Sequence, residues 1–339
     1  MPSDPAIPPG QPIVTVLGSV NMDLVIRCQR LPAPGQTVMA RSMIEVPGGK
    51  GANQAVAAVR SGGNVRMIGR VGDDGFAPKL MQTLIDESVD CRRLLVSANC
   101  ESGLALVGVE DSGENSIIIV PGANARVTAQ DVLESNELIQ TSAVLMAQLE
   151  TPTEAVIAGI RIARQAGVKV MLDPAPASEV LPRELFDVDL ICPNETEATT
   201  IVGGTLETID DAVVVAKKLH ALGPRAVAIT LGARGTLLYN GSTSELIESI
   251  PIKCVDTTAA GDAFAGALAV RWAETGDLVQ SIRWANVAGA LATSSLGAQP
   301  SLPTRSQIDT AMGVSPWVTS SDRPEADTTS AGGVSHRKE

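Results

Sequence analysis

The stretch that decides the fold is residues 143–172, AVLMAQLETPTEAVIAGIRIARQAGVKVML. An apolar run at 143–148 reads as a strand, the stretch after Pro152 as a helix, and the apolar run at 168–172 as the next strand. A strand, a crossover helix and a strand in this order imply parallel pairing and a right-handed connection. The sequence therefore predicts an open α/β sheet here.

The same alternation continues on both sides of this stretch. Further strands are expected at 13–19, 189–192 and 226–230, and helices over Asn53–Arg60, from near Asn194, and over about 261–273 and 278–294. We expect a three-layer, doubly wound, mainly parallel sheet with helices on both faces.

Two segments, 22–48 and 102–120, interrupt the alternation. Both look like antiparallel strands with turns, as in ALVGVEDSGENSIIIV around Asp111. They predict a small β-strand lid attached to the main sheet. Edge strands of that same sheet are the alternative.

Composition supports one large domain. The chain has 339 residues, of which 44% are hydrophobic but only 2% aromatic, so its core is expected to consist of Val, Ile, Leu and Ala. We assign residues 13–312 to this domain. Residues 1–12, rich in proline, are expected to form a flexible extension, and the polar residues 315–339 a disordered tail.

Net charge and the absence of targeting signals speak against a nucleic-acid-binding, secreted or membrane protein. The 26 basic and 38 acidic residues give a formal net charge of −12, which disfavours nucleic-acid binding. The N-terminus carries no secretory pattern and no segment approaches the roughly 20 apolar residues of a membrane helix. The five cysteines are odd in number and form no CxxC pair, so we expect free thiols in a reducing, cytoplasmic compartment.

Polar residues gather where the expected strands end. Asn21 and Asp23 follow the first strand, Glu150 the strand at 143, Asn194 the strand at 189 and Gly232 the strand at 226. Ligands of open α/β sheets bind at the carboxyl ends of the strands. One crevice is expected to collect all five residues.

The strongest chemical signal is DTTAAGDAFAGAL, residues 256–268. Small residues lead directly into a helix, so that backbone N–H groups can close on an anion at the helix N-terminus. A carboxylate beside that anion, Asp262, suits a base that takes a proton from an attacking hydroxyl. A capping Asp at the start of a helix is the alternative.

Two motifs suit the binding of hydroxyl groups. PGGKGANQA (47–55) is not a Walker motif, because Lys50 is followed by glycine, but its glycines allow close backbone approach and Lys50 and Asn53 offer donors. A flexible turn before a helix is the alternative. In GSVNMD (18–23), Asn21 and Asp23 combine donors and acceptors that suit vicinal hydroxyls, or simply form a turn.

Two further motifs suit a nucleotide. In PNETE (193–197), Asn194 and Glu197 lie one helical turn apart and could hold a hydrated Mg²⁺, while the same spacing forms a capping box. In TLGARG (230–235), two glycines flank a turn where backbone could hold phosphates, or which is an ordinary β-turn. It lacks the full dinucleotide fingerprint, which disfavours a nicotinamide enzyme.

Taken together, these motifs resemble the ribokinase family of carbohydrate kinases over about residues 13–312. Both signatures of that family, GGKGANQA and DTTAAGDAFAGAL, are present. Five shorter segments support the resemblance in the right order: NMD (21–23), AQLETP (147–152), DPAPA (173–177), PNETEA (193–198) and GAQPS (297–301).

The resemblance implies roles for individual residues. Asp262 matches the catalytic base, and Ala260 and Gly261 match the anion hole. The sugar contacts implied are Asn21, Met22, Asp23, Gly49, Lys50, Gly51, Asn53 and Glu150. The ATP contacts implied are Asn194, Glu197, Thr230, Gly232, Ala233, Arg234, Gly235, Gly261 and Asn286. A monovalent cation, usually K⁺, is implied at Asp256, Thr258, Ala292, Ser295, Gly297 and Ser301.

The resemblance also implies an activity: ATP-dependent phosphorylation of D-ribose at the 5-hydroxyl, with Mg²⁺ arriving with ATP, and a homodimer formed through the lid strands. A kinase for 2-deoxyribose, another pentose or adenosine is the nearest alternative. The few aromatic residues speak against a nucleoside, whose base needs an apolar slot. The other alternative is a non-catalytic sugar-binding relative, against which Asp262 and the anion-hole residues speak.

Overall fold

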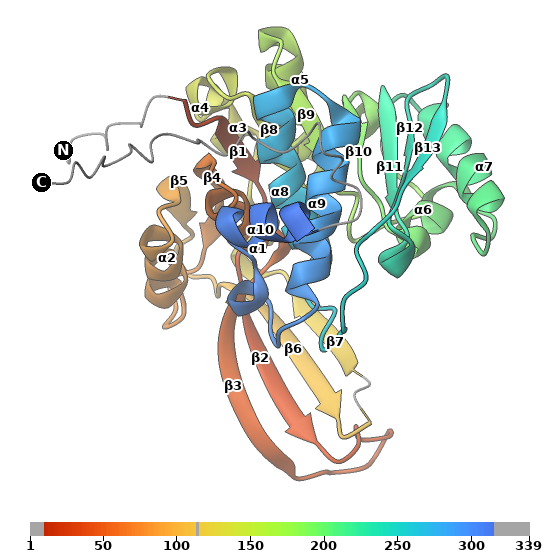
Figure 1. The fold of residues 1–339 in the computed structure, drawn as a ribbon. Coiled ribbons are helices and arrows are strands. Elements are labelled where there is room, and N and C mark those ends of the chain that lie inside the picture. The colour runs from red at the N-terminus through yellow and green to blue at the C-terminus, as the bar shows by residue number, and fades with distance from the viewer. Residues whose placement is uncertain (1–9, 113–114, 315–339) are drawn as a thin grey trace, which may run out of the picture.

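The structure is a computed structural model that describes residues 10–112 and 115–314. Its main sheet has nine strands in the order β13-β12-β11-β10-β9-β8-β1-β4-β5 (Figure 1). The seven strands from β11 to β5 pair in parallel, and β12 and β13 are added antiparallel. The expected tail, and residues 1–9 of the expected extension, lie outside the described residues.

The strands of the main sheet alternate with helices along most of the chain. The strands are β1 (Ile13–Leu17), β4 (Asn64–Val71), β5 (Asp90–Val96), β8 (Val144–Ala147), β9 (Lys169–Leu172), β10 (Leu190–Ile191), β11 (Ala226–Thr230), β12 (Thr236–Tyr239) and β13 (Ser244–Ile247). The α-helices are α1 (Lys50–Arg60), α2 (Ala77–Asp86), α3 (Ala129–Leu133), α4 (Asn136–Gln140), α5 (Thr153–Ala166), α6 (Glu195–Val202), α7 (Ile209–His220), α8 (Ala260–Thr275), α9 (Leu278–Ala292) and α10 (Arg305–Val314).

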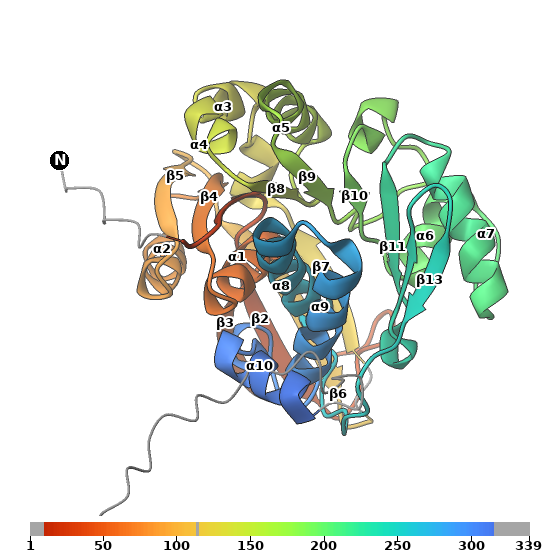
Figure 2. The same cartoon turned by 45° about the horizontal axis from the view of Figure 1, so that its top comes forward.

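Helices cover both faces of the sheet, which confirms the expected three layers. One buried apolar cluster joins the sheet to α1, α2, α8, α9 and α10, and a second joins it to α3, α4, α5, α6 and α7. The two groups of helices lie on opposite sides of the strands in Figure 2. Because the sheet is buried on both faces, its strands consist of almost continuous apolar residues.

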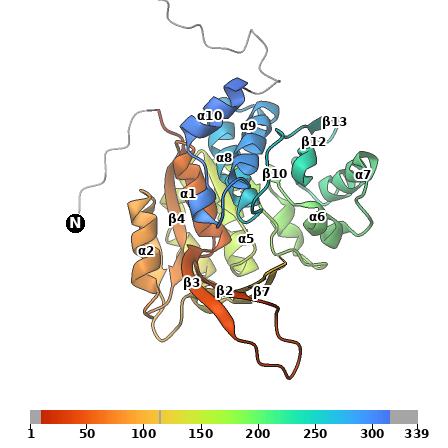
Figure 3. The same ribbon diagram turned by 60° about the horizontal axis from the view of Figure 1, so that its bottom comes forward.

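The segments that break the alternation form a separate four-stranded sheet, the lid sheet, in the order β3-β2-β6-β7. Its strands are β2 (Asn21–Cys28), β3 (Ala40–Gly48), β6 (Gly103–Glu110) and β7 (Asn115–Val120). Both pairs β2–β3 and β6–β7 are antiparallel as expected, but β2 and β6 pair in parallel. The lid sheet projects from one end of the main sheet (Figures 1 and 3), so the alternative of edge strands is wrong.

Several elements differ from the sequence expectation. Helix α1 begins at Lys50 rather than Asn53, so the lysine and Gly51 lie in its first turn and not in a flexible turn before it. Strands β4, β5, β12 and β13 were not foreseen. Within the described ranges, no helix is long and apolar enough to cross a membrane, and the five cysteines, all inside those ranges, are free thiols.

Candidate active site

The site is built around the first turn of α8. The residue before this helix, Ala259, has a left-handed backbone with φ 59°, a conformation that costs energy for a residue with a Cβ and is often found at functional sites. The N–H of Ala260 bonds to Thr257 O at 3.2 Å, whereas the N–H groups of Gly261 and Asp262 meet no acceptor within residues 10–112 and 115–314. These free donors at a helix N-terminus can bind an anion.

Asp262 does not cap its helix, so the capping alternative is wrong. Its carboxylate accepts from Asn53 Nδ2 at 3.0 Å through Oδ2 and from Gln54 Nε2 at 3.2 Å through Oδ1. The residue is only 7% exposed. Burial raises the pKa of Asp262 to about 6; the nearby Lys50 ammonium and these two hydrogen bonds offset part of the rise.

The close contact of α1 and α8 places these donors. A Cβ on Gly266, one turn after Asp262, would lie 2.5 Å from Ala57 Cβ and 2.8 Å from Gln54 O, so only glycine permits this approach. The small residues of GANQAVAA and GDAFAGAL therefore act as a packing pair. Their contact brings Asn53 and Gln54 against the carboxylate of Asp262.

A second acidic group lies at the start of the lid sheet. Burial, followed by the negative charges of Glu150 and Asp262, raises the pKa of Asp23 to about 7. Glu150 accepts from Ser19 Oγ and from the backbone N–H of Lys50, the latter at 3.2 Å. Asp23 therefore lies near Glu150, which is another of the five residues expected in one crevice, and near Asp262.

The neighbouring residue of the lid, Asn21, is held in a fixed orientation. Its Oδ1 accepts from Asn124 Nδ2 at 2.7 Å, and Asn124 Oδ1 accepts from Val20 N at 2.9 Å. Both asparagines are buried. The bond to Oδ1 leaves the amide donor of Asn21 free for a ligand in the crevice.

The glycines of PGGKGANQA allow the chain to pass close to the segment that joins β1 to β2. Gly49 has φ 90°, and a Cβ there would lie 2.7 Å from Asn21 N. A Cβ on Gly51 would lie 2.5 Å from Ser19 N. Both positions require glycine, which explains the motif without any Walker-type phosphate loop.

Lys50 is the main positive charge of the crevice. Its Nζ lies 3.6 Å from Asp173 Oδ2. Burial lowers the pKa of Lys50, but the surrounding carboxylates outweigh it and raise the pKa well above its usual value, Asp173 first and then Asp262, Glu197 and Glu150. The lysine therefore stays charged among carboxylates predicted for the sugar side and for the nucleotide side.

The predicted nucleotide residues form a neighbouring cluster. Asn194 and Glu197 form the capping box of α6: Oδ1 of Asn194 accepts from Glu197 N, and Oε2 of Glu197 accepts from Asn194 N, both at 2.8 Å. Residue Asn194 forms a bridge to Thr230, the last residue of β11. Burial, followed by the charge of Asp173, raises the pKa of Glu197, and the charges of Lys50 and Asp262 also act on this carboxylate.

The stretch Gly232–Arg234 forms a 3₁₀ turn after β11, with Gly232 at φ 57° and Gly235 at φ 98°. Arg234 pairs with Glu195 at 2.8 Å, and Ala233 lies within the turn. The predicted turn is present, next to the start of α6.

Asn286 on α9 differs from the other nucleotide candidates because its side-chain polar atoms form hydrogen bonds within the protein. Its Oδ1 accepts from Thr236 Oγ1 at 2.6 Å, and its Nδ2 donates to Ile247 O at 2.8 Å. These bonds fix α9 to β12 and β13. The structure therefore gives Asn286 a structural function at the edge of the nucleotide side.

The residues expected to hold a monovalent cation connect two loops. Asp256 accepts from Thr258 N at 2.9 Å through Oδ1 and from Gly297 N at 2.9 Å through Oδ2. Ser301 lies in the 3₁₀ turn Gln299–Ser301 after Gly297. In the described part of the chain, no group of three His, Cys, Asp or Glu could hold a metal ion. One carboxylate and backbone carbonyls are oxygen donors that suit K⁺.

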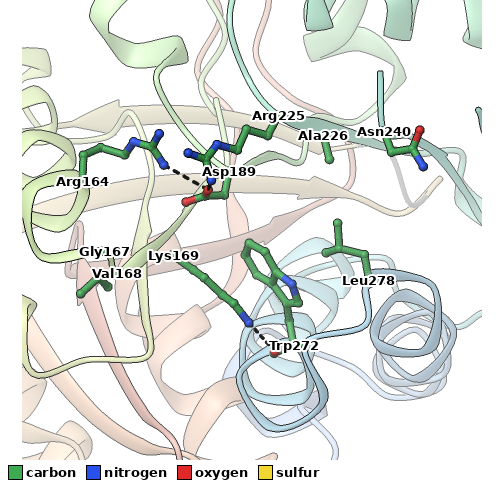
Figure 4. Close-up of a pocket in the computed structure, with 11 residues that line it drawn as sticks. Arg164, Gly167, Val168, Lys169, Asp189, Arg225, Ala226, Asn240, Trp272 and Leu278 are labelled. Atoms are coloured by element: carbon green, nitrogen blue, oxygen red, sulfur yellow. Dashed lines mark hydrogen bonds and ion pairs between the residues drawn. The ribbon is translucent and has the colours of Figure 1, made fainter. Parts of the chain in front are cut away.

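A cavity of about 510 Å³ lies elsewhere, where β9, β10 and β11 begin (Figure 4). Arg164 and Arg225 both pair with Asp189, at 3.1 and 3.0 Å, and Lys169 donates to Trp272 O at 3.0 Å, as the dashed lines in Figure 4 show. Its charged groups are thus paired with each other or with the end of α8. No predicted site residue lines this cavity.

Sequence reasoning missed several residues of the site. Asp173, Gln54 and Asn124 are buried and contact the predicted residues Lys50, Asp262 and Asn21, and the buried Gln148 contacts Gln54. Gln54 lies inside the quoted GGKGANQA motif and Asp173 opens DPAPA. The available signals were a polar residue inside the apolar first part of α1, for Gln54, and a polar residue directly after the apolar strands β8 and β9, for Gln148 and Asp173.

The raised pKa values predict a pH dependence. Asp262 must be ionised to accept a proton, so activity is lost as pH falls through its pKa of about 6, and protonation of Asp23 near 7 adds to this loss. At saturating ATP, kcat/KM for the sugar is expected to fall between about pH 8 and pH 5, with a coupled midpoint between about 6 and 7. A constant kcat/KM down to about pH 5 would contradict this expectation.

Comparison with known proteins agrees with this geometry. The profile of the pfkB family of carbohydrate kinases matches residues 12–305. The chain is 38% identical to a ribokinase of Haemophilus influenzae over 295 residues, 87% of this chain and 96% of that protein. It is 31% identical to a deoxyribokinase of Salmonella typhi, over 87% of this chain and 97% of that protein.

A solved structure shows the same fold. The structure of Arabidopsis thaliana ribokinase complexed with ribose and ATP superposes with a TM-score of 0.84 at 32% identity, covering 90% of this chain and all of that one. The profile match spans most of the chain and includes Asp262, Lys50 and Asn194. The chain therefore belongs to the pfkB family of carbohydrate kinases.

Proposed function

We propose that this kinase transfers the γ-phosphoryl group of ATP to the 5-hydroxyl of D-ribose, giving D-ribose 5-phosphate and ADP. The observation that carries the proposal is the buried carboxylate of Asp262 beside the free N–H groups of its own helix N-terminus. A base and an anion site are thus adjacent. The similarity to ribokinases supports ribose as the acceptor.

Asp262 acts as the base of this reaction. It orients the sugar hydroxyl and accepts its proton as the oxygen attacks the γ-phosphorus. The free N–H groups of Gly261 and Asp262 lie in the first turn of α8, where they stabilise the charge of the transferring group, whereas the N–H of Ala260 bonds to Thr257 O. Little further covalent chemistry is needed, because phosphoryl transfer depends mostly on positioning and electrostatics.

The sugar binds between the lid sheet and α1. The free amide donor of Asn21 and the carboxylates of Asp23 and Glu150 can bond several hydroxyls, each of which donates and accepts. Asn53 Oδ1 is buried and has no hydrogen-bond partner in the described structure. A sugar hydroxyl would satisfy it, which explains an otherwise costly buried acceptor.

ATP binds along α6 and the turn Gly232–Arg234. Within the described residues the N–H of Gly232 has no acceptor, whereas that of Gly235 bonds to Gly232 O at 3.1 Å, and the N-terminus of α6 adds its dipole. Asn194 and Glu197 would hold Mg²⁺ through its water molecules, and the ion would offset the negative charge of the phosphates. The raised pKa of Glu197 fits a position that gains from a nearby cation.

Potassium ions are expected to activate the enzyme. A cation held by Asp256 and neighbouring carbonyls would order the loop that leads into Ala259 and the anion hole, since Asp256 already connects this loop to Gly297. Adding K⁺ to enzyme in buffer free of K⁺ and Na⁺ should raise kcat severalfold. An unchanged rate would reject this site.

The lid strands also supply a surface for a homodimer. The side chains of Ile117, Ile118, Ile119 and Val120 on β7 are each at least 44% exposed, on both faces of the lid sheet. Apolar side chains exposed in a row favour contact with another protein surface. Light scattering that gives twice the mass of the 35.0 kDa chain would support this assembly.

A substrate panel tests the acceptor. ADP release is measured with Mg²⁺, K⁺, ATP and equal concentrations of D-ribose, 2-deoxy-D-ribose, D-fructose or adenosine. The expected result is the highest kcat/KM with D-ribose. Because a deoxyribokinase is among the relatives, a preference for 2-deoxyribose would replace ribose but keep the kinase reaction.

A further inference from the structure

A fully buried amide connects the base to a second carboxylate. Gln54 on α1 is 0% exposed. Its Nε2 donates to Asp173 Oδ2 at 2.7 Å and to Asp262 Oδ1 at 3.2 Å. An amide nitrogen carries two hydrogens, so it can serve both carboxylates at once. Gln54 is thus a neutral bridge between two acidic groups that would otherwise repel each other.

A hydrogen bond to its oxygen fixes the orientation of the Gln54 amide. Gln148, at the end of β8, is also 0% exposed, and its Nε2 donates to Gln54 Oε1 at 2.6 Å. If the amide of Gln54 were reversed, its oxygen would face both carboxylates and its nitrogen would face another donor. The chain Gln148, Gln54, Asp262 therefore has one favourable arrangement.

The other charged groups near the base are held by the same network. Lys50 and Asp173 are the charges that act on Asp262, and Asp262 in turn acts on Asp23 and Glu197. Asp173 also lies 3.6 Å from Lys50 Nζ. Gln54 therefore contacts Asp173, which is paired with Lys50, and Asp262, the proposed base.

We propose that Gln54 is a positioning residue that holds Asp262 toward the acceptor hydroxyl and bridges its carboxylate to that of Asp173, with Gln148 fixing its amide. The proposal rests on the proposed kinase function. It explains why two glutamines are buried completely beside the reaction site, where an apolar side chain would otherwise be favoured.

Gln54→Met tests the proposal, because methionine has a similar length but donates no hydrogen bond. We expect roughly a tenfold lower kcat from the less well positioned base. The pH midpoint of kcat/KM should move upward, since Asp262 loses a donor that favours its charged form. KM for ATP should stay within about twofold of wild type.

Thr15→Val is the matched control. Thr15 is also 0% exposed and bonds Leu138 O at 3.2 Å and Ser142 Oγ at 2.7 Å, away from the carboxylates. The Thr15→Val variant should be less stable than wild type, without any change in kcat or in the pH midpoint of kcat/KM. If Thr15→Val changed both as much as Gln54→Met, the effect would be structural and the proposal would be wrong.

A second variant, Gln148→Met, keeps Gln54 but frees its amide to rotate. It should change kcat and the pH midpoint in the same direction by a smaller amount, and it decides the question if Gln54→Met does not fold. A folded Gln54→Met or Gln148→Met variant with the kcat and the pH midpoint of wild type would overturn the proposal. A wild-type enzyme that phosphorylates no sugar would instead refute the proposed function.

Discussion

Asp262→Asn is expected to lower kcat by about 10²–10⁴, the usual effect of removing a general base. Asparagine keeps the shape of the side chain but cannot accept the proton of the hydroxyl. It also presents one oxygen where Asn53 and Gln54 supply two donors, so one donor loses its acceptor. KM for ATP should change little, because most of the predicted nucleotide contacts lie at the start of α6 and after β11.

The fold should survive this change, since removal of a buried charge offsets the lost hydrogen bond. Circular dichroism and the melting temperature are the controls. A folded Asp262→Asn enzyme with a kcat close to wild type would show that the base lies elsewhere.

Asp23→Ala is expected to reduce kcat/KM for the sugar by on the order of 10²-fold, because hydrogen bonds to a charged group contribute about 1.5–3 kcal/mol each. The loss should appear mainly in KM for the sugar, with KM for ATP nearly unchanged. Steady-state kinetics with each substrate varied in turn checks this. Unchanged sugar binding would mean that Asp23 lies outside the sugar site.

The same variant should also change how the stability of the protein depends on pH. Because the pKa of Asp23 is raised to about 7 in the folded protein, the folded state binds a proton more tightly than the unfolded one. Proton binding by Asp23 therefore stabilises folded wild type at about pH 4, and this stabilisation is lost as pH rises to about 7. The Asp23→Ala variant has no such contribution to lose. The melting temperature of the variant relative to wild type should rise over that range, whereas a constant difference would contradict the raised pKa.

The main sheet was predictable because its strands are apolar and separated by helices. Strands β1, β8, β9, β10 and β11 lie where the alternation places them. Strand β4, in contrast, contains Arg66 and Arg70 among its apolar residues, which obscures the pattern. The start of α1 was misplaced because its first turn contains Gly51, a poor helix former that is required there by contact with Ser19.

The candidate site was predictable where a motif is local. The turn before α8, the capping box at Asn194 and the glycines around Lys50 are each contained in a few consecutive residues. Contacts between distant segments were not predictable: Gln54 meets Asp262 because Gly266 lets α8 approach α1, and it meets Asp173 and Gln148 because the ends of β9 and β8 lie against α1. The internal bonding of Asn286 likewise depends on where α9 lies against β12.

The most direct test of the account is to identify the product. Enzyme, ATP, Mg²⁺, K⁺ and D-ribose are incubated, and the phosphorus resonance of the product is recorded with proton coupling. We expect one molecule of sugar phosphate for each ADP formed, and we expect the phosphorus of the sugar phosphate to couple to the two protons on C5. ADP without a sugar phosphate, a phosphate on another oxygen, or no turnover of ribose in folded enzyme would contradict it.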